Sequence, residues 1–319
     1  MSAPEKKSER LLLYLETDEG DGFAPGAFFL HFGGGYQSGT AAIEKHQEFF
    51  RATDMDFVKI QFEVGFPAFE ATSPADYDSI PVFPNSLFEN QLAVVKGLVD
   101  ALKPEALVVL TLYSPFMITS GMVGRETLIR HMEEDPERVA TGIEIVSDGL
   151  MKFVRECIRV GVDGFYHSTQ GGESKRFKDR SLFLNYVKPS DLRVMKEIDE
   201  ACPFSILHIC DYHQEFGFYD DLTPFLDYPG TVVNVSTEIG GRSWSPSELA
   251  SFFDRPFMGG LSRLGLLATG TPEEAREAAR PVLVNRPAKF ILGADCTVPG
   301  NTPWSNLRAA IDEAHGAGS

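Results

Sequence analysis

Residues 257–293, FMGGLSRLGLLATGTPEEAREAARPVLVNRPAKFILG, contain the unit from which the fold is predicted. The segment opens with a short apolar run at 257–260 and leads to a helix at 271–284, which begins with Thr-Pro-Glu-Glu, a typical helix start. A second apolar run follows at 289–293. A strand, a helix and a strand in this order predict two parallel strands joined by a right-handed crossover.

The same alternation extends along most of the chain. Six further apolar runs are predicted strands: 27–32, 57–62, 106–112, 164–168, 204–210 and 231–235. Further helices are predicted at 40–53, 86–102, 122–134, 136–160, 190–201, 221–227, 245–253 and 302–315. Eight strand–helix units favour an α/β fold of the (β/α)8 or TIM-barrel type over an open doubly wound sheet. We expect one barrel domain at 26–319 after an N-terminal extension at 1–25.

Composition and charge exclude several classes of protein. The chain has 319 residues, of which 43% are hydrophobic and 24% charged, as in ordinary globular proteins. Acidic residues outnumber basic ones by 46 to 29, and a net charge of −17 disfavours nucleic-acid and membrane-surface partners. Polar residues interrupt every apolar run before the roughly 18 residues of a membrane span, and the N-terminus lacks a signal-peptide pattern. A cytoplasmic location is therefore expected.

Three metal-ligating residues follow two of the predicted strands. In a barrel the active site lies at the carboxyl ends of the strands. His208 and Cys210 end the fifth strand, and residues two apart on a strand point to the same face. Cys296 lies just past the eighth strand, across the barrel from the fifth. One imidazole and two thiols suit a catalytic zinc ion with a fourth position for another ligand.

A carboxylate could fill that fourth position. Glu238, just after the sixth strand, is the first candidate, both as a metal ligand and as a catalytic residue. Asp211, Glu173 and Asp295 are the alternatives. Arg242 and Arg263 lie near strand ends and could hold an anionic part of a substrate or cofactor.

A second polar group occurs near the first two strands. The candidates for substrate or cofactor binding are Tyr36, Gln37, Lys59 and Gln61. A lysine inside a barrel strand must be paired or functional. Lys59 could therefore contact the substrate, or it could form a buried ion pair with Asp56 or Glu63. The long loop at 65–85 could be a lid over the site or a docking surface for a partner.

Two segments carry a resemblance to a known family. LHICDYH (207–213) and ILGADCTVPGNTPWSNLRAAIDEA (291–314) resemble regions of the uroporphyrinogen decarboxylase superfamily. The match is to its zinc-dependent branch, the corrinoid:coenzyme M methyltransferases. That branch is marked by a His-x-Cys motif and a distant C-terminal Cys as zinc ligands, which correspond here to His208, Cys210 and Cys296. The resemblance implies a TIM-type barrel and zinc-activated methyl transfer.

The resemblance also implies a corrinoid, which must be supplied by a partner protein. The chain contains no D-x-H-x-x-G sequence of the kind that binds cobalamin. The small-molecule partner is left open. A thiol or folate could accept the methyl group, or a methoxylated compound could donate it.

The sequence leaves two alternatives open. The first is a metal-free decarboxylase or lyase of the same fold. The decarboxylase branch has an R-Q-x-G-R-Y motif that binds carboxylates, whereas residues 31–36 here are HFGGGY, without the arginines. The net charge of −17 also disfavours a polyanionic tetrapyrrole. The second is a non-catalytic member of the family that binds a tetrapyrrole or a partner protein.

Overall fold

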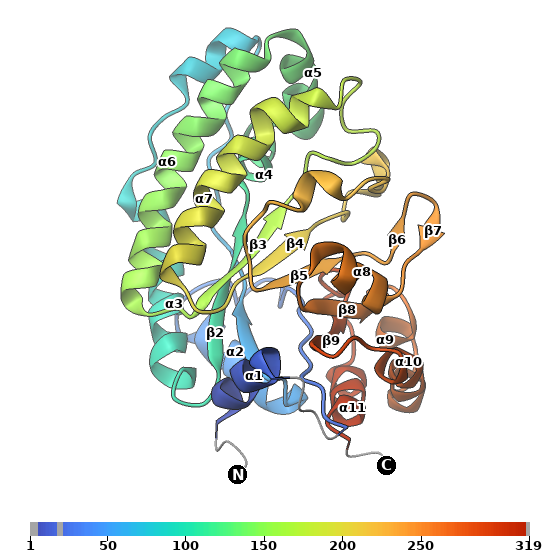
Figure 1. Cartoon of the computed structure of the whole chain (residues 1–319). Coiled ribbons are helices and arrows are strands. Elements are labelled where there is room, and N and C mark those ends of the chain that lie inside the picture. Colours follow the sequence, from blue (N-terminus) through green and yellow to red (C-terminus); the bar gives the residue numbers. More distant parts are fainter. Residues whose placement is uncertain (1–5, 18–21, 317–319) are drawn as a thin grey trace.

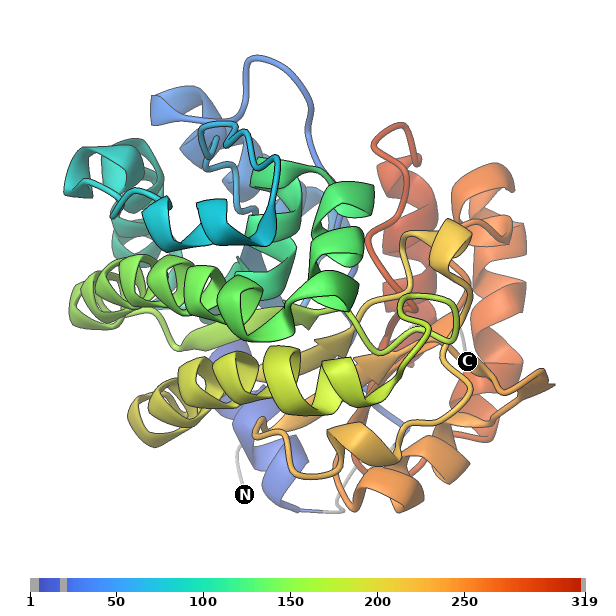
Figure 2. The ribbon, with the colours of Figure 1, turned by 90° about the horizontal axis from the view of Figure 1, so that it is seen from above.

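The computed structural model describes residues 6–17 and 22–316. Its centre is one strongly curved, all-parallel sheet surrounded by helices (Figures 1 and 2). In spatial order the strands are β1 (Phe57–Ile60), β2 (Leu107–Tyr113), β3 (Gly164–Thr169), β4 (Ile206–Ile209), β5 (Val232–Val235), β8 (Phe257–Leu261) and β9 (Phe290–Ala294). The predicted α/β alternation is therefore present.

The predicted closed barrel of eight strands is not formed. Residues 27–32 run extended between the two edges of the sheet, but only Gly26 forms an isolated bridge, to Leu292 of β9. On the side of Gly26 that faces β1, the Asp56 backbone N–H donates to the Gly26 carbonyl at 3.0 Å. The Phe29 carbonyl then accepts from Val298, in the loop after β9, at 2.8 Å. Residues 27–32 therefore bond to the loop after β9 and form no ladder with a neighbouring strand. The sheet remains open and curled, with seven strands.

Most of the helices follow the predicted pattern. They are α1 (Lys7–Glu16), α2 (Gly39–Thr53), α3 (Glu89–Leu102), α4 (Pro115–Val123), α5 (Arg125–Glu134), α6 (Pro136–Val160), α7 (Lys188–Ala201), α8 (Pro246–Phe253), α9 (Leu266–Thr269), α10 (Pro272–Val284) and α11 (Trp304–Ala314). Asp135 caps α6 by accepting from the Arg138 N–H at 3.3 Å. The predicted helix at 122–134 is divided by Gly124, whose φ of 90° is incompatible with a continuous helix.

The long loop at 65–85 packs against the outside of α6. A side chain at Gly142 would come within 2.8 Å of Tyr77, and one at Gly149 within 2.7 Å of Phe83. These two glycines let the loop, including its 3-10 turn Pro74–Ser79, lie directly on the helix. The part at 74–83 belongs to the outer layer of the molecule, so the lid interpretation does not apply to it.

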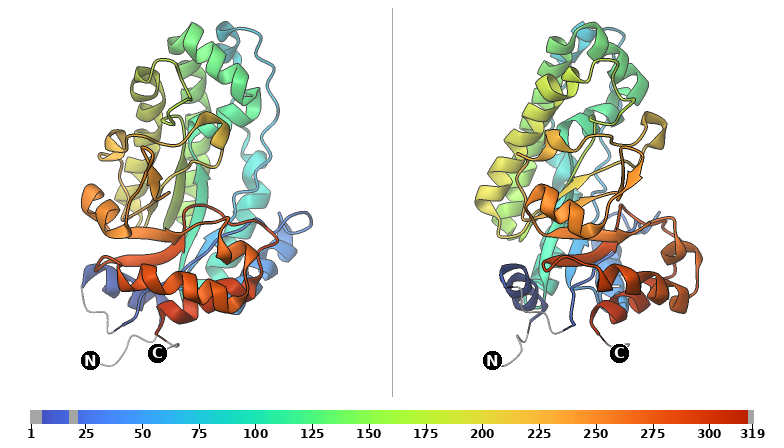
Figure 3. Two further views of the ribbon diagram at one scale, coloured as in Figure 1. Left: turned by 90° about the vertical axis from the view of Figure 1, so that its right-hand side faces the viewer. Right: turned by 45° about the vertical axis from the view of Figure 1, so that its right-hand side comes forward.

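Helix α1 packs below the sheet, at the same end of the molecule as the end of α11 (Figure 3). Its Arg10 forms an ion pair with the buried carboxylate of Asp56, which also accepts from His315 at 2.8 Å and from the Gly26 N–H at 2.8 Å. Residues 1–5 and 18–21 of the predicted extension lie outside the described residues. Among the described helices, none has the length and apolar character needed to cross a membrane.

Candidate metal centre

Two strand ends bring His208, Cys210 and Cys296 together. His208 lies in β4, Cys210 directly follows that strand, and Cys296 lies two residues beyond the end of β9. One ligating atom from each side chain lies within 4.8 Å of the others, and all three residues are buried. Within the described part of the chain, this is the group of His, Cys, Asp or Glu side chains that could hold a metal ion.

The contacts of the three side chains fit a metal ion. The Cys296 Sγ lies 3.4 Å from Nε2 of His208, and the His208 ring is stacked on Tyr166 with centroids 4.9 Å apart. Among the described residues, no group forms a hydrogen bond with His208 Nδ1, although this atom is buried. Two thiols and the Nε2 atom of His208, which faces the Cys296 sulfur, form a soft donor set of the kind that binds zinc.

The two thiols differ in acidity. A hydrogen bond from Cys296 and the positive charge of His208 lower the pKa of Cys210 well below its usual value. The same thiol pair raises the pKa of Cys296, since a thiolate on Cys210 opposes a second negative charge nearby. One thiol therefore loses its proton readily, and a bound cation would displace the other proton.

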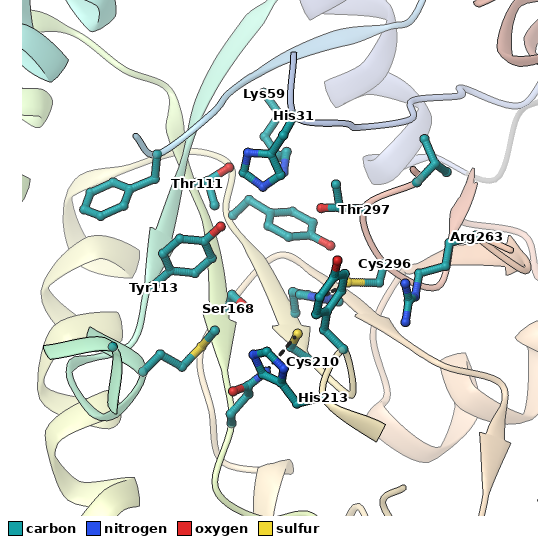
Figure 4. Close-up of a pocket in the computed structure, with 18 of the residues that line it drawn as sticks. His31, Lys59, Thr111, Tyr113, Ser168, Cys210, His213, Arg263, Cys296 and Thr297 are labelled. Atoms are coloured by element: carbon teal, nitrogen blue, oxygen red, sulfur yellow. Dashed lines mark hydrogen bonds between the residues drawn. The ribbon is translucent and has the colours of Figure 1, made fainter. Parts of the chain in front are cut away.

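These ligands form part of the wall of a cavity of about 680 Å³ (Figure 4). The inner face of the sheet contributes Lys59 from β1, Thr111 and Tyr113 from β2, and Ser168 from β3. Arg263 and His213 come from the loops that follow β8 and β4. A cavity of this size, at the carboxyl ends of parallel strands, is suited to a small-molecule substrate.

Of the four candidates predicted near the first two strands, Lys59 lines this cavity, as does the separately predicted Arg263. Lys59 is only 4% exposed, and its Nζ lies 4.6 Å from the ring centroids of both Phe29 and Tyr166. Burial lowers the pKa of Lys59 to about 7, although negative charge on Cys296, Cys210 and Glu63 opposes this shift. Among the described residues, no carboxylate lies within ion-pair distance of it.

The alternative interpretation, a buried ion pair of Lys59 with Asp56 or Glu63, is therefore wrong. Asp56 pairs with Arg10 and His315 below the sheet. Glu63 pairs with His31, with Oε1 2.9 Å from Nδ1. Both carboxylates are used by other partners, so the ammonium of Lys59 faces the cavity and the aromatic rings without a counter-ion.

The structure separates Glu238 and Arg242 from the site. They lie in an exposed antiparallel hairpin of β6 (Glu238–Ile239) and β7 (Arg242–Ser243), which projects from the side of the molecule (Figure 1). The Glu238 carboxylate accepts from Ser243, whereas Arg242 pairs with Glu248 at 3.2 Å and lies 4.0 Å from the Trp244 ring. Neither lines the cavity, so the structure does not support Glu238 as a ligand or catalytic residue.

Tyr36, Gln37 and Gln61 do not line the cavity either. Tyr36 is 40% exposed, and Gln37 donates to Glu63 Oε2 at 3.4 Å. Gln61 is buried beside His46, whose Nε2 accepts from its backbone N–H at 3.1 Å. Gln61 directly follows β1, but the strand that Tyr36 and Gln37 were expected to follow is not formed, and none of the three is part of the cavity wall.

The alternative fourth ligands lie outside the metal-ligating group. Burial and the charge on Cys210 raise the pKa of Asp211 to about 6. Asp295 accepts from the Arg263 backbone N–H at 2.8 Å, and Glu173 forms a buried ion pair with Arg176. None of these carboxylates therefore joins His208, Cys210 and Cys296 in the group that could hold a metal ion.

Comparisons with known proteins agree with this architecture. A curved parallel sheet with a cavity at the carboxyl ends of its strands is typical of barrel-like α/β proteins. Residues 54–317 match the sequence model of uroporphyrinogen decarboxylase (URO-D), and the chain belongs to this family. A search of curated protein sequences found no match.

Two solved structures with similar folds bear names from methyl-transfer chemistry. A methyltransferase from Methanosarcina mazei aligns over 99% of this chain and 100% of its own, with a TM-score of 0.76 and 14% identity. A putative vitamin-B12 independent methionine synthase from Listeria monocytogenes aligns over 86% of this chain and 85% of its own, with a TM-score of 0.57 and 14% identity. At this level of identity the likeness concerns the fold.

Proposed function

We propose that the protein is a zinc-dependent methyltransferase that moves a methyl group between a corrinoid carried by a partner protein and a small molecule. The observation that carries this proposal is the convergence of His208, Cys210 and Cys296 within 4.8 Å in the wall of the cavity. A decarboxylase that uses no metal would have no need of two thiols and an imidazole at this place.

The three ligands would hold zinc and leave room for one more ligand from the cavity. Bound zinc would act as a Lewis acid that keeps a substrate thiol ionised at neutral pH, or that polarises the oxygen of a methoxylated donor. Two thiolates and a neutral imidazole balance the charge of the ion. His208 is oriented by its stacking on Tyr166, which fixes the plane of the ring.

Lys59 and Arg263 supply the positive charge of the cavity near these ligands. Arg263 is 9% exposed and lies 4.6 Å from the Tyr212 ring, and Lys59 has no carboxylate partner among the described residues. Buried positive charge without a counter-ion, as on Lys59, is costly, and an anionic group on the substrate would remove this cost. We therefore assign to the substrate at least one carboxylate, sulfonate or similar group.

A direct assay follows the methyl group. The zinc-loaded protein is mixed with methylcobalamin and a short thiol that bears a carboxylate or sulfonate, and the loss of the cobalt–methyl spectrum is followed together with the thioether formed. The proposal predicts turnover that disappears in Cys296→Ser and falls strongly in Lys59→Met. If thiols and methoxylated donors all fail while a carboxylated substrate loses CO2 without metal, the decarboxylase alternative replaces this one.

A further inference from the structure

The loop that follows β3 contains three buried polar side chains with no part in the function proposed above. They are Gln170, Glu173 and Arg176, which are 4%, 2% and 2% exposed. Together they connect to one of the metal-ligating thiols. Buried polar groups of this kind persist only when they are fully bonded, so each contact restricts the position of the next.

Gln170 links this loop to Cys210. Its Nε2 donates to the Cys210 Sγ at 3.4 Å, and its Oε1 accepts from Arg176 Nη2 at 3.4 Å. A guanidinium only donates hydrogen bonds. The side-chain oxygen of Gln170 must therefore face Arg176, which leaves the amide nitrogen directed at the sulfur.

Arg176 is held in place by its own partners. Its Nε donates to Glu173 Oε2 at 3.0 Å, its Nη2 donates to Oε1, and Glu173 Oε2 also accepts from the Gly171 N–H at 2.8 Å. The ring of Phe216 covers the guanidinium with 3.7 Å between the ring centroid and Cζ. Two parallel bonds and a stacked ring fix the plane of the guanidinium.

The ion pair of Arg176 with Glu173 positions the Gln170 amide and adds little to the stability of the fold. Burying an arginine and a glutamate costs desolvation energy that their attraction only about offsets, so an apolar pair would stabilise the fold equally well. An apolar pair could not set the orientation of the Gln170 amide. The arrangement therefore makes sense as support for the Cys210 contact.

We propose that Glu173 and Arg176 position Gln170 as a hydrogen-bond donor to the Cys210 thiolate, and that this bond tunes the sulfur as a zinc ligand. The inference rests on the zinc site proposed above. A donor on a thiolate withdraws electron density from the sulfur and fixes its position. Partners outside the ligand set, when removed from metal sites, typically cost about 10- to 100-fold in metal affinity.

Cobalt substitution tests this role without any activity measurement. Co²⁺ is bound in place of zinc to the wild type, Gln170→Leu and Gln170→Met, and the sulfur-to-cobalt charge-transfer band and the metal affinity are recorded. Gln91→Leu is the matched control. Gln91 is also 4% exposed and fully bonded, to the Glu63 N–H at 2.8 Å and the Gln61 carbonyl at 3.0 Å, but it contacts no thiol.

Both Gln170 variants should shift the band to lower energy and bind Co²⁺ about 10- to 100-fold more weakly, while Gln91→Leu matches the wild type. Arg176→Lys, which keeps the charge but loses the paired bonds, should shift the band in the same direction. A wild-type band and affinity in whichever Gln170 variant folds would overturn the positioning role and leave the zinc site intact. Failure of the wild-type protein to bind Co²⁺ would instead refute the zinc site.

Discussion

Replacing Lys59 by methionine should make the protein more stable at neutral and mildly acidic pH while it weakens binding of the substrate. The ammonium lies 4.6 Å from the ring centroids of both Phe29 and Tyr166, and burial lowers the pKa of Lys59 from 10.5 to about 7. At about 1.36 kcal/mol per pKa unit, this shift corresponds to up to about 5 kcal/mol of unfavourable free energy in the folded state at low pH. Methionine has a similar length and packs well against aromatic rings.

The stability difference between Lys59→Met and the wild type should depend on pH. Between pH 7 and 10.5 the unfolded chain binds more protons at Lys59 than the folded one, so the wild type gains stability as the pH rises through this window. Well below pH 7, Lys59 is protonated in both states, and the full free-energy cost of burying its charge is present. The advantage of Lys59→Met in free energy of unfolding should therefore be largest near pH 6 and shrink steadily as the pH rises through 9.5.

Denaturant unfolding of the wild type and Lys59→Met at several pH values between 6 and 9.5 measures this difference. Lys152→Met, at an exposed position on α6, is the matched control and should show no such trend. A variant that is less stable than the wild type at every pH, or whose difference from the wild type does not change with pH, would show that burial of the Lys59 ammonium does not destabilise the fold.

Three further predictions concern the ligands and the base of the sheet. In a metal analysis, Cys296→Ser should lack the zinc expected in the wild type, whereas Cys157→Ser, at a buried position inside α6, should contain it. Glu238→Gln should retain zinc, because its carboxylate lies in an exposed hairpin; a loss of zinc would restore it as a ligand. Asp56→Asn should lower the free energy of unfolding by about 3 kcal/mol at pH 7, as breaking a buried ion pair does. Burial raises the pKa of Asp56, but the bond to His315 and further contacts outweigh it and lower the pKa below its usual 3.8. The stability that the ionised carboxylate contributes is therefore lost only as the pH falls below about 3.8. Equal free energies of unfolding for Asp56→Asn and the wild type at pH 7 would contradict the prediction.

Periodicity predicted the parallel sheet because its strands are short apolar runs and its helices carry clear start signals. It failed at 27–32, which is equally apolar. The chain forms a bridge at Gly26, just before this segment, and Phe29 then bonds to the loop after β9; no local pattern encodes this choice of partner. Strand edges depend on contacts between distant parts of the chain.

The three-ligand site was predictable because a strand fixes the spacing of His208 and Cys210, and the carboxyl ends of parallel strands meet at one edge. Glu238 was misplaced because two glycines with positive φ, Gly240 and Gly241, turn the chain into a hairpin after β5. Gln170 was missed because β3 extends one residue further than predicted, to Thr169, which places Gln170 directly at the strand end.

Elemental analysis of the purified protein, with His208→Ala beside it, measures whether His208, Cys210 and Cys296 form a zinc site. We expect about one zinc per chain in the wild type and a large loss in the variant, with both proteins folded. No zinc in the wild type after anaerobic loading, or equal zinc in both proteins, would contradict this expectation.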